Sequence, residues 1–295
     1  MSGDAVARIA QARPGLRPSE QRVADAILAE PASIVDLPIT ELAERCSTSV
    51  ATVVRFCQAA GYAGYGELRL ELASTRGREE VSLGRFGVSD GEIEADDDAH
   101  DVLAKIAYHE AHAIESTAAS IDAPTLDAVA GAIAKADRVD IYGVGSSALA
   151  AIDLQQKLHR IGLVSFYNSD IHLALTSAAL LTGRSVSVGF SHSGLSVETV
   201  DSLSTARRAG AATVAVTNFP ASPIAEQADH VLVTSASETR YRPGAMSSRI
   251  AQLAVVDFLF VRLVQGLHGR TLPPLQLTYD AVQTHRLPPT RHRAG

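Results

Sequence analysis

Two short segments of the sequence place glycine and several serines at the end of an apolar, β-branched run. Residues 185–199 read SVSVGFSHSGLSVET, and residues 143–147 read GVGSS after the run VDIY. Glycine lets the backbone approach an anion, serine hydroxyls donate to its oxygens, and a helix that starts there adds unpaired N–H groups and a positive dipole end. We therefore expect two phosphate-binding loops, each at a strand-to-helix junction. Together they predict a pocket for a sugar phosphate.

The expected phosphate contacts are the residues of these loops that offer a hydroxyl, an imidazole or close backbone approach. They are Ser146, Ser147, Ser191, His192, Ser193, Gly194 and Ser196. Single serines usually cap helices, but two glycine-flanked clusters make capping alone a poor explanation. The alternative is a dinucleotide site, because GVGSSA fits the fingerprint G-x-G-x-x-A and Asp170 follows the second expected strand. That alternative leaves the segment SHSGLS unexplained.

Strand-like and helix-like segments alternate between residues 100 and 282. The expected strands are Val139–Tyr142, Leu163–Tyr167, Ser185–Phe190, Thr213–Thr217 and His230–Val233, with helices at 147–161, 170–181 and 197–209 among them. Alternation at this spacing is typical of an α/β domain with a doubly wound, five-stranded parallel sheet. Such sheets bind ligands outside the carboxyl ends of their strands, where both serine loops lie.

Before this domain, two short amphipathic helices flank a polar turn. The first covers Ile39–Cys46, and Cys46-Ser47-Thr48-Ser49 forms a turn that can cap the second. One side of the second helix carries Val50, Val53, Cys57 and Ala60, and the opposite side carries Thr48, Thr52, Arg55 and Ala59. Small residues, hydroxyls and an arginine suit a helix that reads the DNA major groove. The expected DNA contacts are Ser47, Thr48, Ser49, Thr52 and Arg55. The alternative is an ordinary helical hairpin with a solvated face.

Composition is that of a soluble protein, with 295 residues, 46% of them hydrophobic and 20% charged, which suffices for two domains. The net charge of -7 gives no global sign of nucleic-acid binding, yet residues 45–78 hold five Arg against two Glu, a net of +3. Two cysteines and an N-terminus without an apolar signal core fit a cytoplasmic protein with no membrane partner. The apolar stretch 250–264 contains Asp257 and Arg262, so we expect a buried helix.

These features divide the chain into four parts. We expect an all-α helix-turn-helix domain in residues 1–78, an acidic, glycine-containing linker or poorly packed crossing in 79–99, the sheet domain in 100–282 and a tail in 283–295. Cys46 and Cys57 lie on apolar faces, which predicts core packing. The run His109-Glu110-Ala111-His112 lacks the zinc spacing HExxH, so we expect no metal, and no cofactor is expected either.

Several of these segments together resemble one protein family. The pieces SEQRVADAILAEP, SxATVVRFCQAAGY and GYGELRLEL resemble the N-terminal domain of RpiR-type transcriptional regulators, and GVGSS, SHSG and RPGAMSSRIAQLAVVDFLF resemble the SIS (sugar isomerase) domain of the same regulators. The resemblance covers nearly the whole chain in the family's domain order. It implies a bacterial regulator of sugar metabolism genes that binds operator DNA, senses a phosphosugar and forms dimers or tetramers. It also implies that Ser147, Ser191, Ser193 and Ser196 hold the ligand phosphate.

Residues after the last expected strand are candidates for the sugar end of this ligand. They are Glu238 and Arg242, with Arg240 between them. SIS domains also occur in isomerases and lyases of sugar phosphates, which need a placed acid or base, and Glu198, His192 and Glu238 are available. An isomerase has no need of a helix-turn-helix, so we expect a regulator and not an enzyme.

Overall fold

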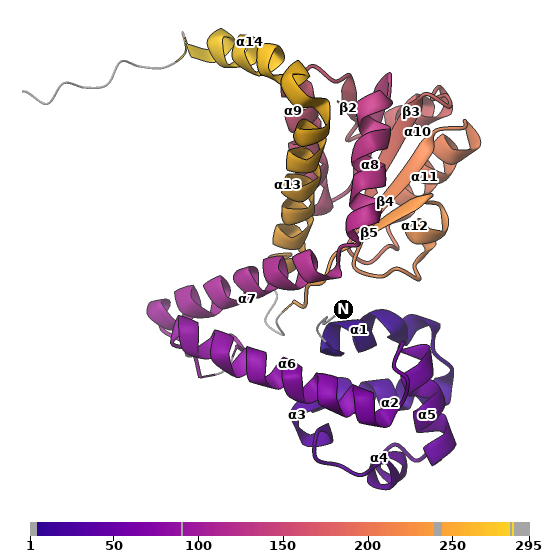
Figure 1. The fold of residues 1–295 in the computed structure, drawn as a ribbon, viewed down its shortest axis with the longest axis vertical. Coiled ribbons are helices and arrows are strands. Elements are labelled where there is room, and N and C mark those ends of the chain that lie inside the picture. The colour runs from indigo at the N-terminus through magenta and orange to yellow at the C-terminus, as the bar shows by residue number, and fades with distance from the viewer. Residues whose placement is uncertain (1–4, 90, 239–243, 284, 286–295) are drawn as a thin grey trace, which may run out of the picture.

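The computed structural model describes residues 5–89, 91–238, 244–283 and 285 of the chain. A helical N-terminal part is followed by an α/β part, which confirms the predicted fold class (Figure 1). Two long helices, α6 (Tyr65–Phe86) and α7 (Ala99–Ser120), connect the two parts. Helix α6 packs with the helical part and α7 packs against the α/β part, so the pair forms the bridge between them.

Six α-helices of the described chain build the helical part around one core. They are α1 (Ala5–Ala12), α2 (Pro18–Ala29), α3 (Pro31–Ile34), α4 (Ile39–Arg45), α5 (Val50–Ala59) and α6. Proline stands at the first position of α2 and α3, where its missing N–H costs nothing. The fully buried side chains of Ile9, Val23 and Phe56 bring α1, α2 and α5 together.

The sheet contains five parallel strands in the order β2-β1-β3-β4-β5. They are β1 (Arg138–Gly143), β2 (Ser165–Tyr167), β3 (Ser185–Phe190), β4 (Ala212–Thr217) and β5 (His230–Val233). Two of the predicted strands match the observed bounds at both ends, and the other three differ by one or two residues. Chain order reverses beside β1, because β2 pairs with one edge of it and β3 with the other.

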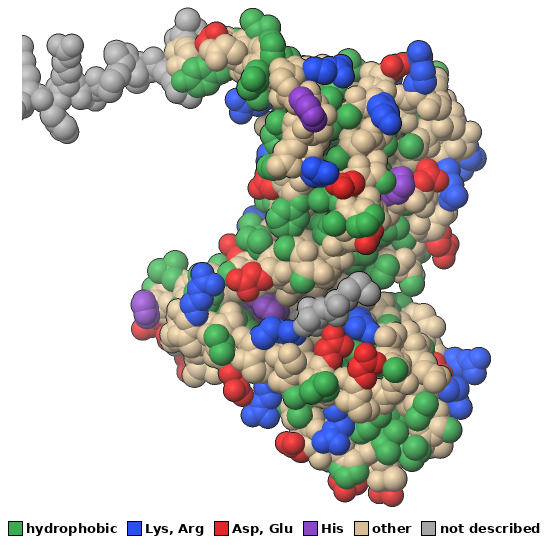
Figure 2. All heavy atoms as spheres, in the orientation of Figure 1, with side chains coloured by type: hydrophobic (Ala, Val, Ile, Leu, Met, Phe, Trp, Pro, Cys, Tyr) green, Lys and Arg blue, Asp and Glu red, His purple; other side chains and the backbone are tan. Residues whose placement is uncertain are grey.

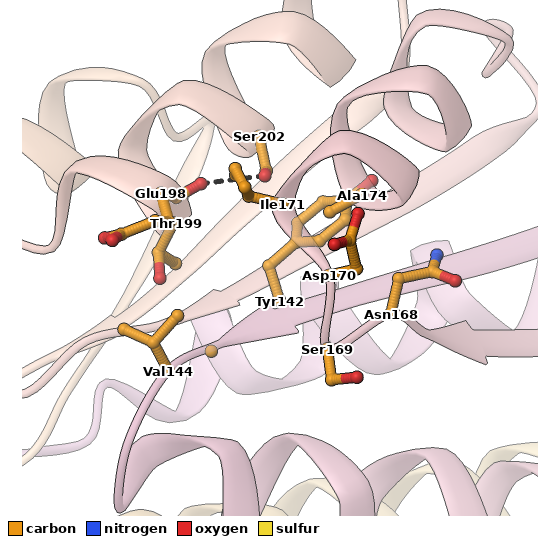
Figure 3. Close-up of a pocket in the computed structure, with 11 residues that line it drawn as sticks. Tyr142, Val144, Asn168, Ser169, Asp170, Ile171, Ala174, Glu198, Thr199 and Ser202 are labelled. Carbon is orange, nitrogen blue, oxygen red and sulfur yellow. Dashed lines mark hydrogen bonds between the residues drawn. The ribbon is translucent and has the colours of Figure 1, made fainter.

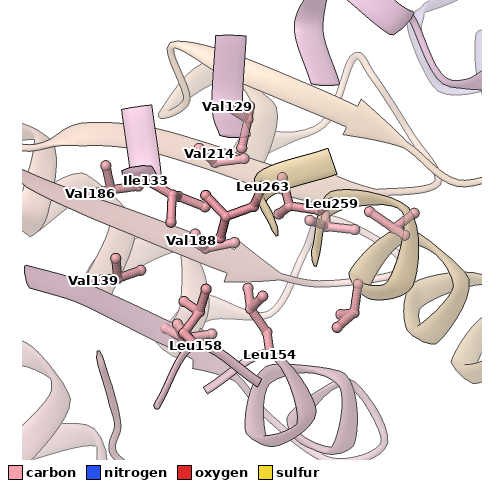
Figure 4. Close-up of a cluster of buried hydrophobic side chains, with 14 of the residues drawn as sticks. Val129, Ile133, Val139, Leu154, Leu158, Val186, Val188, Val214, Leu259 and Leu263 are labelled. Carbon is pink, nitrogen blue, oxygen red and sulfur yellow. The ribbon is translucent and has the colours of Figure 1, made fainter. Parts of the chain in front are cut away.

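Helices cover both faces of this sheet. One face carries α8 (Ala123–Lys135), α9 (Ser147–Arg160) and α13 (Ser247–Leu267), and the other carries α10 (Ile171–Ala179), α11 (Val197–Arg208) and α12 (Pro223–Glu226). Leu154 and Leu158 of α9 meet Leu259 and Leu263 of α13 over Val188 (Figure 4). Leucines four residues apart lie on one face of a helix, so both helices turn a continuous apolar stripe to the sheet.

The helical stretch Ser247–Gln283, which begins with α13, is long and apolar enough to cross a membrane by length and composition. The α13 side chains Val255, Leu259 and Leu263 are nevertheless buried in the core over the sheet. The expectation of a buried helix in this stretch is therefore confirmed. A final helix, α14 (Leu272–Gln283), extends beyond the body of the domain (Figure 1).

The segment 79–99 differs from the expected linker over its first residues, because α6 continues to Phe86. Charges four residues apart favour a helix here, as the Arg76–Glu80 ion pair of 3.0 Å shows. Gly87 ends the helix in the left-handed conformation, at φ +70°. The connection between α6 and α7 is thus confined to 87–98, and the domain bounds 1–78 and 100–282 stay predictions.

Candidate functional site

The two serine loops lie side by side at the carboxyl edge of the sheet. Strands β1 and β3 are paired up to Gly143 and Phe190, and each loop follows directly. This is the point where the strand order reverses, which leaves a crevice outside the strand ends. The structure therefore brings together the two segments that the sequence singled out.

In both loops the serine at the helix N-cap leaves the helix uncapped. Ser146 is the N-cap of α9 and Ser196 that of α11, and neither side chain accepts a bond from its helix. Ordinary capping therefore does not explain these two serines. The Ser196 hydroxyl instead lies 3.1 Å from that of Ser191, which is buried, 1% exposed.

The loops and the start of α13 enclose a pocket of about 320 Å³, called the serine pocket below. Five of the predicted phosphate contacts line it: Ser146, Ser147, His192, Ser193 and Ser196. Ser191 and Gly194 do not line it. Ser191 supports Ser196 from behind, and Gly194 shapes the loop through its left-handed backbone, at φ +69°.

Helix α13 contributes three pocket residues that the sequence analysis missed, Ser248, Arg249 and Gln252. The Arg249 Nε and the Gln252 Nε2 are buried donors with no hydrogen-bond partner among the described residues. Among the described residues, the Arg249 guanidinium forms a long ion pair with Glu110 of α7, with Nη2 to Oε1 at 3.9 Å. Buried donors that lack a partner cost free energy, so these two favour an acceptor in the pocket.

Three helices begin at this pocket. Ser147 is the first residue of α9, Ser196 precedes α11, and Ser248 is the second residue of α13. Helix N-termini carry unpaired N–H groups and a positive partial charge. The Arg249 guanidinium adds a positive charge to the same pocket. The arrangement suits a phosphate.

Glu238, expected at the sugar, serves the start of α13. Its carboxylate accepts hydrogen bonds from the Ser248 N–H at 3.0 Å, the Met246 N–H at 3.3 Å and the Ser248 hydroxyl. Glu238 therefore positions the pocket wall that carries Arg249. Arg240 and Arg242 lie outside the described residues.

The helix-turn-helix geometry is present in α4 and α5. Ser47 adopts a positive φ of 48° in the turn, and the Ser49 side chain caps α5 by accepting from the Thr52 N–H at 3.3 Å. Cys46 and Cys57 are both buried and free, as expected. Burial raises the pKa of the Cys57 thiol to about 11, which keeps it protonated and inert.

The sequence analysis placed Thr52 on the exposed side of α5, but the structure buries it. It is 5% exposed, and its hydroxyl lies 3.1 Å from that of Ser49 and accepts from Arg55 at 2.9 Å. Val50, expected inside, is 39% exposed. Phe56, one turn after Thr52, is fully buried, so the buried face of α5 is centred on Thr52, Val53, Phe56 and Cys57.

Comparisons with known proteins decide the family. Residues 4–78 match the helix-turn-helix domain of the rpiR family, and residues 132–262 match the SIS domain. An uncharacterised HTH-type transcriptional regulator of Caldanaerobacter subterraneus is 37% identical, over 96% of this chain and 99% of its own. The chain belongs to the RpiR family of transcriptional regulators. A second relative of this RpiR-family chain, an uncharacterised HTH-type transcriptional regulator of Haemophilus influenzae, is 33% identical over 97% of this chain and 99% of its own.

Solved structures are similar to this RpiR-family chain in both parts. The NanR protein of Vibrio vulnificus, solved with ManNAc-6P, has a TM-score of 0.62 and 26% identity, over 96% of this chain and all of its own. The sugar isomerase domain of an RpiR transcription factor from Sphaerobacter thermophilus has a TM-score of 0.56 and 26% identity, over 61% of this chain and 98% of its own.

A second pocket of about 290 Å³ lies beside the loop that follows β1, between α10 and α11 (Figure 3). Its lining includes Tyr142, Asp170 and Glu198. The Asp170 carboxylate caps α10 by accepting from the Leu173 N–H at 2.9 Å, which gives it a structural use. Burial, with buried Asp140 nearby, raises the pKa of Tyr142 far above its usual value, so its hydroxyl stays protonated.

The three acid–base candidates of the isomerase or lyase alternative therefore lie at three different places in the structure. Glu198 lines the second pocket, His192 lines the serine pocket, and Glu238 caps α13. Concerted proton transfer needs groups within hydrogen-bond reach of one substrate.

Arg55 of α5 is tied to the helical core and still reaches solvent. Its side chain is 49% exposed, and its Nε lies 3.6 Å from the Glu20 carboxylate of α2, which is 7% exposed. Other exposed residues of the turn and helix are Ser47, Ser49, Ala51, Gln58 and Ala59. Arg55 thus sits on the solvent side of α5, five residues after its first residue, Val50.

Arg55→Ala is expected to weaken binding to duplex DNA. It should also lower the free energy of unfolding by about 1 kcal/mol, because the buried Glu20 carboxylate loses its cation, while solvent around the half-exposed guanidinium partly screens the pair. The matched control is Gln58→Ala, which removes an exposed polar side chain one turn further along α5. DNA affinity measured against salt should lose about one unit of slope in the arginine variant alone. Equal salt slopes in both variants and the parent would remove Arg55 from the DNA contact surface.

Proposed function

We propose that this RpiR-family regulator binds a phosphosugar in the serine pocket and that the ligand modulates its binding to operator DNA of sugar metabolism genes. The observation that carries the proposal is the pair of buried donors Arg249 Nε and Gln252 Nε2, which have no partner among the described residues and lie in a pocket of serines and helix N-termini. A phosphate has acceptors for both donors and for the hydroxyls.

The phosphate contacts in this proposal are Ser146, Ser147, His192, Ser193, Ser196 and Arg249, with Ser191 and Gly194 as supporting residues. The relative solved with ManNAc-6P supports a phosphosugar as the chemical class of ligand. On the DNA side the contacts are Ser47, Thr48, Ser49 and Arg55, with Thr52 holding Ser49 and Arg55 in place. We place the protein in the cytoplasm.

We propose a homo-oligomer, a dimer or a tetramer. Apolar side chains gather over α13 and α14 on the face shown in Figure 2. Val261, Leu277 and Tyr279 are 56%, 71% and 44% exposed. Apolar surface of this kind is typical of faces that a partner covers. A two-fold dimer would also present two recognition helices to one operator.

The test is calorimetric titration of the full chain with hexose 6-phosphates, amino sugar 6-phosphates and pentose 5-phosphates, with the free sugars as ligand controls. We expect one phosphosugar to bind, and each of Ser147→Ala and Ser193→Ala to weaken it about ten- to hundredfold, because each loses a hydrogen bond to a charged group. Ser204→Ala, on α11 outside the pocket, is the matched control. A ligand that binds both pocket variants as tightly as the parent would place its site elsewhere.

The second candidate is a sugar-phosphate isomerase or lyase, and the carboxylates of the second pocket are the observation in its favour. Incubation with the bound phosphosugar separates the two candidates. A regulator returns the ligand unchanged, whereas an enzyme converts it and loses turnover in Glu198→Gln.

A further inference from the structure

The first helix of the DNA-binding part contacts the end of the sheet. Gln11 of α1 donates from Nε2 to the backbone oxygen of Thr234 at 3.2 Å. Thr234 follows β5 directly and is fully buried. Helix α1 is anchored in the helical core by Ile9, so the Gln11 bond joins two separately packed parts of the molecule.

Residues 234–236, called the junction segment below, are fixed to the end of β4 by one buried amide. The Asn218 Oδ1 accepts from the Thr234 hydroxyl at 3.3 Å and from the Ala236 N–H at 2.9 Å. Asn218 is 4% exposed. A shift of the junction segment would leave this amide oxygen and its donors unpaired, which is costly in a buried site.

The end of β4 in turn holds residues 191–196 of the second serine loop, called the effector loop below. The His192 backbone oxygen accepts from the Asn218 N–H at 3.0 Å and from the Thr217 hydroxyl at 3.2 Å. The His192 ring also packs edge-to-face against Phe219, with ring centroids 5.9 Å apart. Two buried residues at the end of β4, Thr217 and Asn218, therefore link His192 in the pocket to Thr234, which contacts α1.

A second branch reaches the bridge between the two parts. The Thr117 hydroxyl of α7 accepts from the Ser235 N–H at 3.0 Å and donates to the Ser235 oxygen at 3.4 Å. Thr117 is fully buried, and α7 packs against α6 of the DNA-binding part. The junction segment thus contacts the DNA-binding part directly through α1 and indirectly through α7.

We propose that the junction segment couples the effector loop to the DNA-binding part, with Gln11 as the residue that responds to it. The two states are α1 docked on Thr234 and α1 released from it. An ordered effector loop holds Asn218 and Thr234 in place and favours docking, and by linkage docking favours anion binding by the same factor. The proposal rests on the proposed function only in taking the serine pocket as the effector site.

The first test compares hydrogen exchange in the full chain of Gln11→Ala and Gln21→Ala without ligand. Gln21 also donates to backbone oxygens, at 3.1 Å to Leu16 and 3.4 Å to Arg13, but within the helical part. We expect amides of 191–196 and 217–219 to exchange about two- to tenfold faster in the Gln11 variant, since one hydrogen bond stabilises docking, and at the parent rate in the Gln21 variant. Parent-like exchange of both segments in the Gln11 variant overturns the coupling.

The second test adds inorganic phosphate as the probe. In the parent chain, phosphate should slow hydrogen exchange both in residues 191–196 and in α1. In Gln11→Ala, phosphate should slow exchange in residues 191–196 alone and should bind about two- to tenfold more weakly. Protection of 191–196 in the parent without any change in α1 overturns the coupling and leaves the pocket intact. If phosphate protects neither segment, the pocket proposal fails, and the comparison of Gln11→Ala with Gln21→Ala still decides the coupling.

Discussion

Gly194→Ala is expected to abolish phosphosugar binding and to lower the free energy of unfolding by about 2–5 kcal/mol. A Cβ at this position would lie 2.1 Å from the Ser222 Oγ and 2.3 Å from the Ser222 Cβ, and the backbone φ is +69°. The loop cannot move away freely, because the Gly194 oxygen accepts from the Ile224 N–H at 3.2 Å. Relief of the clash must therefore displace Ser193 and Ser196 from the pocket wall.

The matched control for this variant is Gly145→Ala in the first loop. Gly145 also has a positive φ, +57°, but nothing lies within 4 Å of its added Cβ. Only the left-handed conformation is penalised there, by about 1–2 kcal/mol. Urea unfolding and calorimetry measure both effects, and equal losses in the two variants would contradict the crowding argument.

The double variant Gly194→Ala/Ser222→Gly separates the clash from the backbone strain. Ser222 precedes α12 without capping it through its side chain, so its own loss should cost little. Removal of its Cβ and Oγ opens the space that the new methyl group needs. Recovery of binding in the double variant is expected, and no recovery would show that backbone strain alone is responsible.

The second large effect is expected for Arg249→Gln, which should weaken phosphosugar binding about a hundredfold or more because a charge-assisted contact to the phosphate is lost. The fold should persist, because the side chain is 36% exposed and its only carboxylate contact among the described ion pairs is 3.9 Å long. Arg262→Gln is the matched control on the same helix, since Arg262 pairs with Asp127 away from the pocket. Similar affinity losses in both variants would indicate a general charge effect.

The strands were predictable from the sequence because each is a short apolar, β-branched run with polar residues or glycine at its ends. Ser185–Phe190 and His230–Val233 match the structure at both ends. The second strand is two residues shorter than predicted and begins at Ser165, in the edge strand of the sheet. The position of β3 beside β1 depends on tertiary packing, which periodicity does not contain.

Half of the pocket was predictable and half was not, for a physical reason. Ser147 and Ser193 belong to contiguous glycine-serine motifs whose chemistry is local. Arg249 and Gln252 lie on a helix that starts far along the chain, and only the packing of α13 on the sheet turns them to the pocket. For Thr52 the signal was available, since Phe56 stands three residues after Val53 and extends the buried face of α5.

The central claim is most directly tested by the response of operator binding to the phosphosugar. Fluorescence anisotropy with a duplex selected for binding to the parent chain, at fixed salt, gives the operator Kd with and without the phosphosugar found by calorimetry. We predict a change of about fivefold or more in the parent and in Arg262→Gln, and an unchanged Kd in Arg249→Gln at the same phosphosugar concentration. An Arg249→Gln variant that responds like the parent would contradict the claim that the serine pocket senses the effector.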